Sequence, residues 1–451
     1  NVRRGATSTL AVTNTVLAGG NAAFQDSLDV LASSANAALT LTSPAAIAAG
    51  SSANVGVTAA AAGSLAGSLN LGLTSDANGV SGLSNVTLAA GNVTVTGAAY
   101  DYATATLADT AVAFGNIRTG AVRTLGVTNT LAAGGLTSYQ DSLDVVATTA
   151  VGTLTLANPA NLRAAQSANL SLTAATAGSL AGDVALALTS NANGVAGLTN
   201  LALAGRTVAV TGAAYDLASP TYASTLALGN VRVGASTNVA IANPVVTAAA
   251  FQDSLDVVAA RANANLSLTG ATANVLAGAS TNVGVTAAAA GSLADTLALT
   301  LTSNANGVAD LANANLSAGA IAVTGAAYDL ARATFGATSV AFGNVRTGSV
   351  REVALTNTVA TAAAYQDSLD AVASTGVATL TVASPANLAA GSTGYVGVTA
   401  ARAGALTGSV AVALTSNANG VAGLANLGLT GQSVAVTGVA YDLASATLAA
   451  T

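Results

Sequence analysis

The sequence predicts an all-β chain of four similar sandwich domains strung together as an elongated rod. A seven-residue phrase, Phe24 to Val30, returns at spacings of 115, 112 and 114 residues, beginning again at Tyr139, Phe251 and Tyr365. Each period has the size of one small domain and is too long for a solenoid unit. Within each period, short segments of alternating apolar and polar residues lie between turn residues, which is typical of half-buried strands.

The first period shows the expected strands in order. Its alternating segments place β-branched residues or leucine on one face and small polar residues on the other, at 10–13, 39–42, 54–58, 69–74 and 93–96. Turn signals separate them at Gly19-Gly20, Ser43-Pro44, Ala62-Gly63-Ser64, Ala77-Asn78-Gly79 and Thr96-Gly97. About seven strands in roughly 110 residues is the pattern of an immunoglobulin-like β-sandwich.

The domain boundaries are expected after the recurring Tyr-Asp phrase. They give repeat 1 (1–103), repeat 2 (104–218), repeat 3 (219–331) and repeat 4 with a terminal segment (332–451). Linkers of a few residues restrict motion between domains, which is why a semi-rigid rod is expected.

The first strand of repeat 1 is expected to be incomplete, because Asn1 aligns with Asn116 in the middle of a phrase. An incomplete strand leaves backbone groups that a neighbour's terminal segment could pair with by strand addition. The alternative is that the sequence is a window on a longer array of repeats.

The composition argues against an enzyme. Cysteine, histidine, methionine and tryptophan are absent, no lysine occurs, and Glu352 is the single glutamate. The usual general bases, nucleophiles and soft metal ligands are therefore missing, and no catalytic or cofactor-binding residues are predicted. A net charge of −6 has the wrong sign for nucleic acid. Because only 7% of residues are charged, dense self-association through strand edges or lateral faces is expected. No run of residues predicts a transmembrane helix.

Three phrases in repeat 4 resemble a known pattern. They are Val340 to Gly348, Ala354 to Thr358, and Ala400 to Gly404 with Ser416 to Gly420. The chain resembles the choice-of-anchor D type repeat of bacterial secreted surface proteins, which is related to the Hydin-type (ASH) immunoglobulin-like domains. Repeat 3 departs from the pattern, with Leu228-Gly229 in place of Phe-Gly and Ala242-Asn243-Pro244 in place of Thr-Asn-Thr. The resemblance implies an extracellular or cell-surface protein that is structural or adhesive, and it brings no catalytic residues.

Paired carboxylates in the recurring phrase are weak candidates for calcium ligands. The pairs are three residues apart, at Asp26 and Asp29, Asp141 and Asp144, Asp253 and Asp256, and Asp367 and Asp370. Hard oxygen ligands at this spacing suit calcium. The alternative interpretation is a polar turn or a one-turn helix in which the first aspartate caps backbone amides.

Tyrosine, aspartate and arginine recur near the boundaries and are candidates for junctions between repeats. The candidates are Tyr100, Asp101, Arg118, Tyr215, Asp216, Arg232, Tyr328, Asp329 and Arg346. The arginines stand at the head of each repeat and the aspartates at the tail of the preceding one. An arginine–aspartate contact across the boundary would fix the angle between repeats. The alternative is a pair of solvated surface charges.

These observations predict a non-enzymatic structural subunit of a bacterial extracellular assembly, such as a filament, a sheath or a surface layer. The alternative is a spacer or stalk within a large secreted adhesin, which predicts a chain that does not self-associate. Neither function requires a cofactor, and calcium is the one metal that the sequence suggests.

Overall fold

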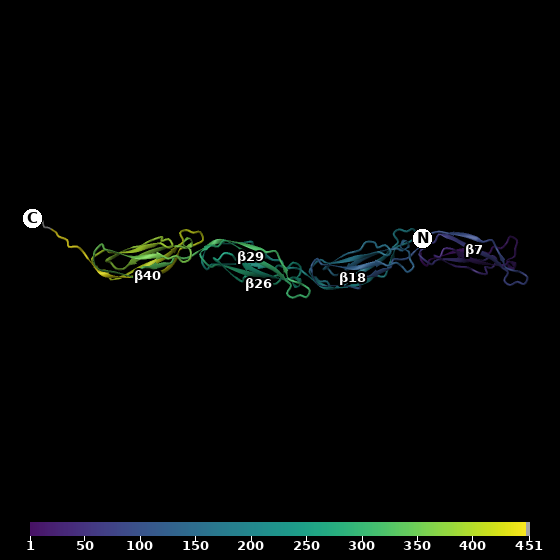
Figure 1. Ribbon diagram of the computed structural model, residues 1–451, viewed down its shortest axis with the longest axis horizontal. Coiled ribbons are helices and arrows are strands. Elements are labelled where there is room, and N and C mark those ends of the chain that lie inside the picture. Colours follow the sequence, from purple (N-terminus) through teal and green to yellow (C-terminus); the bar gives the residue numbers. More distant parts are fainter. Residues whose placement is uncertain (448–451) are drawn as a thin grey trace. The chain divides into compact units, whose positions relative to one another are not determined.

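The computed structural model describes residues 1–447 of the chain, and repeats 2, 3 and 4 each form a β-sandwich of two sheets (Figure 1). The immunoglobulin-like all-β prediction is confirmed. The chain folds into two compact units, residues 1–216 with 308–311, and residues 217–307 with 312–451. The cores of repeats 1 and 2 lie in the first unit, and those of repeats 3 and 4 in the second. Within residues 1–447, no helix has the length and apolarity to cross a membrane.

Repeat 2 shows the complete domain. Its larger sheet contains, in spatial order, β12 (Ala111–Arg118), β20 (Arg206–Tyr215), β18 (Gly182–Asn191) and β14 (Ser142–Thr149). The short strands β17 (Gly178–Ser179) and β19 (Leu201–Ala202) pair with β20 and β18. The second sheet contains β11 (Ala105–Leu107), β13 (Val122–Asn129), β16 (Ser167–Ala174) and β15 (Leu154–Ala157). A 3-10 turn, η2 (Thr137–Tyr139), precedes β14.

Repeat 3 has the same plan and one additional strand. Its larger sheet contains β22 (Thr225–Arg232), β31 (Gly319–Tyr328), β29 (Asp295–Asn304), β24 (Ser254–Ala260) and the additional β26 (Thr272–Val275), with β28 (Gly291–Ser292) and β30 (Ala314–Asn315). Its second sheet contains β21 (Thr221–Tyr222), β23 (Ser236–Ala242), β27 (Ser280–Ala287) and β25 (Leu266–Thr269), and η3 (Ala249–Phe251) precedes β24.

Repeat 4 matches repeat 2 closely. Its larger sheet contains β33 (Ser339–Arg346), β40 (Leu427–Tyr441), β39 (Gly408–Asn417), β35 (Ser368–Thr375) and the short β38 (Gly404–Ala405). Its second sheet contains β32 (Ala333–Phe335), β34 (Val350–Asn357), β37 (Thr393–Ala400) and β36 (Leu380–Ala383), and η4 (Ala363–Tyr365) precedes β35.

Repeat 1 is divided into three smaller sheets. One sheet holds β3 (Ser27–Ser34), β7 (Gly67–Asp76), β8 (Val86–Thr87) and β9 (Gly91–Val95), and another holds β2 (Thr7–Thr13), β5 (Ser52–Ala59) and β4 (Leu39–Thr42). The short β1 (Val2–Arg3), β10 (Ala98–Tyr100) and β6 (Gly63–Ser64) form a third sheet, and η1 (Ala22–Phe24) precedes β3.

A cavity of about 100 Å³ lies in repeat 1, lined by Val2, Leu39, Val57 and Val95 among others. In repeat 2 the corresponding leucines, Leu154 and Leu172, belong to the same core cluster as Phe114 of β12.

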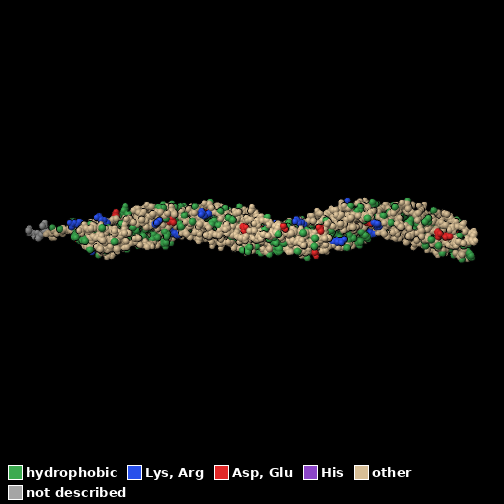
Figure 2. Space-filling model, turned by 60° about the horizontal axis from the view of Figure 1, so that its bottom comes forward, with side chains coloured by type: hydrophobic (Ala, Val, Ile, Leu, Met, Phe, Trp, Pro, Cys, Tyr) green, Lys and Arg blue, Asp and Glu red, His purple; other side chains and the backbone are tan. Residues whose placement is uncertain are grey.

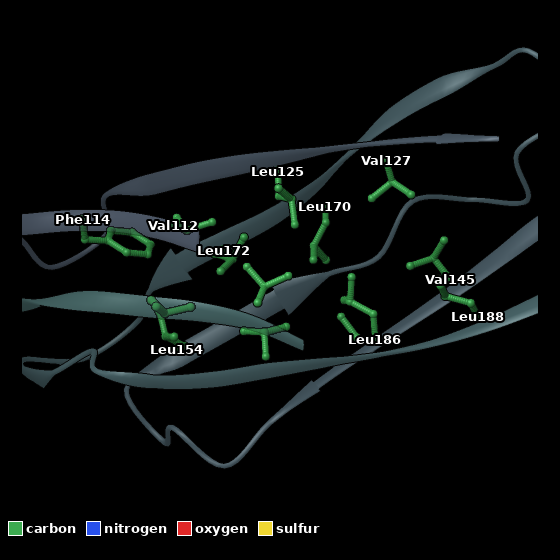
Figure 3. Packing of buried hydrophobic residues seen from close by; sticks show 14 of the residues in the cluster. Val112, Phe114, Leu125, Val127, Val145, Leu154, Leu170, Leu172, Leu186 and Leu188 are labelled. Carbon is green, nitrogen blue, oxygen red and sulfur yellow. The ribbon is translucent and has the colours of Figure 1, made fainter. Parts of the chain in front are cut away.

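The core of each repeat is built from strand residues that alternate in burial. In β14, Leu143 and Val145 are buried while Val146 is half exposed, as period-two geometry requires. Figure 3 shows the repeat 2 core, in which Phe114 and Val112 of β12 belong to the same cluster as Leu154 and Leu172. Each fully buried leucine or phenylalanine contributes roughly 2 kcal/mol through removal of its apolar surface from water. The residue at each predicted boundary (Ala103, Ala218 or Ala331) is buried in the core of the following repeat.

In each complete repeat, the first strand of the larger sheet runs parallel to the last strand of the repeat. In repeat 2, β12 pairs with β20 from Ala111 opposite Ala209 to Arg118 opposite Tyr215. Both strands therefore finish at the same end of the sandwich, which is the end from which the chain passes to the next repeat. This register decides where the head arginines lie.

The turn residues expected at Thr96-Gly97 lie between β9 and β10 in repeat 1, whereas the corresponding residues of the other repeats lie within a strand. The counterparts of Gly97, which are Gly212, Gly325 and Gly438, lie inside β20, β31 and β40. Their φ angles are 131°, 146° and 144°. The pairing of β12 with β20 shifts at this point, between Ala113 and Gly115, so the glycine belongs to a β-bulge. Only in repeat 1, where the first strand is short, does Gly97 separate two strands.

We expect Gly212→Ala to lower the free energy of unfolding of repeat 2 by about 3 kcal/mol. An added Cβ would lie 2.8 Å from the Cβ of Phe114, at a φ that favours glycine. The matched control is Gly97→Ala, whose Cβ would meet nothing nearer than the Asn1 nitrogen at 3.9 Å and is expected to cost about 1 kcal/mol. Denaturant unfolding of each variant measures the difference, and equal losses would contradict the bulge as the cause.

Candidate functional site

The recurring arginine and tyrosine lie side by side at the end of each repeat. The parallel register pairs Arg3 with Tyr100, Arg118 with Tyr215, Arg232 with Tyr328, and Arg346 with Tyr441. Although each arginine stands early in its repeat, the first strand carries it to the far end of the sandwich. Sequence analysis paired these arginines with the tail aspartates of the preceding repeat. Arg232 and Arg346 have other partners, because the first strand spans the domain.

The first unit shows what the arginine of repeat 1 contacts in repeat 2. Arg3 Nη1 lies 2.8 Å from Asp141 Oδ2, and the Asp141 side chain is 1% exposed. The contact is an ion pair without the alignment of a hydrogen bond. Arg3 Nη2 donates to the carbonyl oxygen of Thr199 at 2.9 Å, and the guanidinium lies 4.4 Å from the ring centroid of Tyr102. The first aspartate of the recurring phrase is thus the acidic partner at this junction.

The second unit shows the same contacts between repeats 3 and 4. Arg232 Nη1 donates to Asp367 Oδ1 at 2.8 Å, and Nη2 donates to the carbonyl oxygen of Ala425 at 3.0 Å. Asn230 donates to the carbonyl oxygen of Ala422 at 3.0 Å. The Asp367 side chain is 1% exposed and that of Arg232 is 26% exposed, so this is a largely buried, hydrogen-bonded ion pair.

The buried aspartate also holds the chain that crosses the junction. Ser416 Oγ donates to Asp367 Oδ2 at 2.7 Å and accepts the Ala331 N–H at 2.8 Å. In the first unit, Ser190 links Asp141 to the Ala103 N–H with distances of 2.7 and 2.8 Å. One carboxylate therefore orders both the arginine and the linker.

Backbone hydrogen bonds and a tyrosine pair complete each junction. The Asp329 N–H donates to the backbone carbonyl oxygen of Tyr365 at 2.9 Å, and the Asp367 N–H donates to the backbone carbonyl oxygen of Asp329 at 3.1 Å. The rings of Tyr328 and Tyr365 pack with centroids 5.6 Å apart. In the first unit, Tyr100 and Tyr139 lie 5.5 Å apart in the same tilted geometry. These contacts leave little freedom for the two repeats of a pair to swivel.

The tail aspartates differ between the two junctions. Asp101 Oδ1 lies 3.6 Å from Arg4 Nη1, and Asp101 Oδ2 is buried without a hydrogen-bond donor among the described residues. At the other junction, the hydroxyl of Thr361 donates to Asp329 Oδ2. Asp216 is buried, and Tyr215 and Arg118 are half-buried.

A buried asparagine behind each junction was missed by sequence analysis as a site residue. Asn357 Nδ2 donates to the carbonyl oxygens of Asp367 and Leu388, while its Oδ1 accepts from the Arg332 N–H and from Gln366. The counterparts are Asn14, Asn129 and Asn243, each with Nδ2 bonds of the same kind. The signal was present in the recurring Thr-Asn phrase and in Asn243 of the divergent repeat 3.

The paired aspartates are not in a turn or a one-turn helix. The second aspartate of each pair lies in a strand, since Asp29 belongs to β3 and alternates with the buried Leu28 and Val30. The first aspartate of each pair accepts from a serine hydroxyl, in the pairs Ser75–Asp26, Ser190–Asp141, Ser303–Asp253 and Ser416–Asp367. The second accepts from backbone or asparagine donors, at Asp29 from Ala46, at Asp144 from Asn161 and Asn191, at Asp256 from Asn274 and Asn304, and at Asp370 from Asn387 and Asn417.

The two carboxylates of a pair thus have separate sets of donors. Within residues 1–447, no group of three or more acidic, histidine or cysteine side chains gathers where it could hold a metal ion. The arrangement supplies hydrogen-bond acceptors for the junction and for the loops.

The chain is similar to several solved structures at low sequence identity. No family model matches the chain, and no curated protein matches it. An I-band fragment of titin is 9% identical, covering 75% of this chain and 98% of its own with a TM-score of 0.33. The D00-D0 domain of intimin is 11% identical, covering 48% and 99%, with a TM-score of 0.24. Domains 4–9 of the surface layer protein SbsC are 13% identical, covering 93% and 58%, with a TM-score of 0.18.

Proposed function

We propose that this chain is a non-enzymatic structural subunit of a bacterial extracellular assembly, such as a filament, a sheath or a surface layer. The observation that carries the proposal is the repetition of one built junction. Arg3 with Asp141 and Arg232 with Asp367 make the same buried contact between successive repeats. A chain whose domains are tied together in this way can transmit force and hold a fixed spacing.

The chemistry of the side chains supports a structural role. The chain has no histidine, cysteine or lysine, so a nucleophile with an activating base would have to come from serine, threonine, tyrosine and carboxylates. The carboxylates of the recurring phrase accept hydrogen bonds from serine, asparagine and backbone donors. They hold loops and junctions in place.

The surface supports lateral packing. Figure 2 shows a face on which charged side chains are few and widely separated. One outward position of the strand that follows the 3-10 turn is apolar and exposed in every repeat, with Leu31 at 72%, Val146 at 52%, Val258 at 47% and Val372 at 64%. With few like charges to repel, neighbouring chains can approach closely. The resemblance of the phrases to secreted surface proteins supports a location outside the cell.

Electron microscopy of the purified chain, with and without a calcium chelator, tests this proposal. We expect ordered fibres or sheets in both conditions. Isolated chains at every concentration would contradict it and favour the spacer of a large adhesin. Assemblies that dissolve only with chelator would show that the aspartate pairs, such as Asp26 with Asp29, bind calcium.

A further inference from the structure

We propose that the carboxyl-terminal end of repeat 4 binds the amino-terminal end of repeat 1 in a second copy of the chain. The contacts would be those that join repeat 3 to repeat 4. This inference rests on the proposed function and deepens it by naming the two surfaces and the partner.

The carboxyl-terminal surface consists of Asn344, Arg346, Tyr441 and Asp442, with residues 443–447. Arg346 and Asn344 are exposed, and Tyr441 is 50% exposed. Within its own repeat, Arg346 Nη1 donates to the carbonyl oxygen of Asp442 at 2.9 Å. A shallow hollow of about 430 Å³ lies between these side chains.

The same positions in repeat 3 are occupied by the partner repeat. Asn230 and Arg232, which correspond to Asn344 and Arg346, bond to the loop oxygens of Ala422 and Ala425. Arg232 also binds Asp367. The hydrogen-bond donors that repeat 4 presents at its end therefore have counterparts in repeat 3, and those counterparts are bonded to the repeat that follows.

The amino-terminal surface of repeat 1 presents the complementary half. Phe24 is 89% exposed, Val80 is 55% exposed and Leu83 is 61% exposed. The residues at these positions in repeat 4 are Tyr365, Val421 and Leu424, and all three are half-buried. Tyr365 packs on Tyr328 of repeat 3, so the exposed apolar surface of repeat 1 is the surface that a preceding repeat covers.

Charge and hydrogen-bonding groups are also complementary. Asp26 corresponds to Asp367, accepts from Ser75 at 2.7 Å, and has no ion pair among the described residues. Arg346 corresponds to Arg232, the partner of Asp367. Among the described residues, an arginine without an ion pair at one end therefore matches a carboxylate without an ion pair at the other.

The segment after Tyr441 supplies a further match. Leu443 is 75% exposed, and 442–447 is extended and exposed. Tyr441 to Ala444 repeats the sequence of Tyr328 to Ala331, where the Ala331 N–H donates to Ser416 and the next N–H donates to Asn357. Ser75 and Asn14 of repeat 1 stand at the corresponding positions. Because the two surfaces differ, the contact is heterologous and extends into a chain of subunits or closes into a ring.

Sedimentation velocity of the complete chain over a range of concentrations tests this inference. We expect the wild type to associate, and Arg346→Asp or Asp26→Arg to raise the apparent Kd about 100-fold each. The double variant with both substitutions restores the pair in reverse and is expected to recover association. Circular dichroism checks that each variant is folded.

Matched controls carry the same charge changes on exposed strand positions away from the ends, Arg206→Asp and Asp183→Arg. They are expected to associate like the wild type. A wild type that stays monomeric up to about 1 mM would overturn the inference. Single reversals that associate as well as the wild type would also overturn it, while ordered assemblies of those variants under the microscope would leave the structural role standing through lateral contacts.

Discussion

Replacing Asn357 by alanine is expected to lower the free energy of unfolding of repeat 4 by about 4 kcal/mol, because several buried groups lose their partners together. The side chain is fully buried. Its amide donates to the carbonyl oxygens of Asp367 and Leu388, and its oxygen accepts from the Arg332 N–H and Gln366. Alanine satisfies none of these groups, and each one left unpaired away from water costs about 1 to 3 kcal/mol.

The measurement is denaturant unfolding followed by hydrogen exchange with mass spectrometry, which reports repeat 4 separately from the other repeats. Asn344→Ala is the matched control, since Asn344 is exposed in the same repeat, and it is expected to change stability by less than about 0.5 kcal/mol. A loss below about 1 kcal/mol for Asn357→Ala would show that water replaces the side chain.

Replacing Asp367 by alanine is expected to cost about 3 kcal/mol, the lower end of the range for breaking a buried ion pair, because Arg232 keeps 26% of its side chain exposed. The change removes the acceptor of Arg232 and of Ser416 together. The linker that Ser416 holds through the Ala331 N–H is expected to loosen as well.

The chain contains its own control for this substitution. Asp26 occupies the same position in repeat 1 and accepts from Ser75, without an arginine partner among the described residues. Asp26→Ala is expected to cost about 1 kcal/mol, for one hydrogen bond. Unfolding of the two variants in the same denaturant series gives the contribution of the arginine by difference. Equal losses would mean that the ion pair adds nothing to the junction.

Much of the fold could be predicted from the sequence because period and alternation are local signals. The segment 39–42 coincides with β4, and the segments 10–13, 54–58 and 69–74 lie within β2, β5 and β7. Strand β3 was not among the predicted strands, because the alternative interpretation of Asp26 and Asp29 was a polar turn or a one-turn helix. The buried Leu28 and Val30 outweighed them.

The site was harder to predict because it depends on pairing between distant strands. Recurrence in the sequence singled out the arginine and the tyrosine that lies opposite it. Its partner was missed, since only the parallel register of the first and last strands brings Arg232 to the end that faces Asp367. The first aspartate of the phrase drew a calcium interpretation from spacing alone, whereas Asp367 accepts from a serine and an arginine.

The central claim is that successive repeats are docked by a built junction, and amide hydrogen exchange tests it most directly. The chain provides an internal reference, because Asp329 to Ala331 at the junction and Asp442 to Ala444 in the exposed tail have the same sequence. At a dilution where the chain is monomeric, we expect the amides of Asp329 and Ala331, which donate to Tyr365 and Ser416, to exchange as slowly as strand amides. Exchange at the rate of the tail would contradict the account.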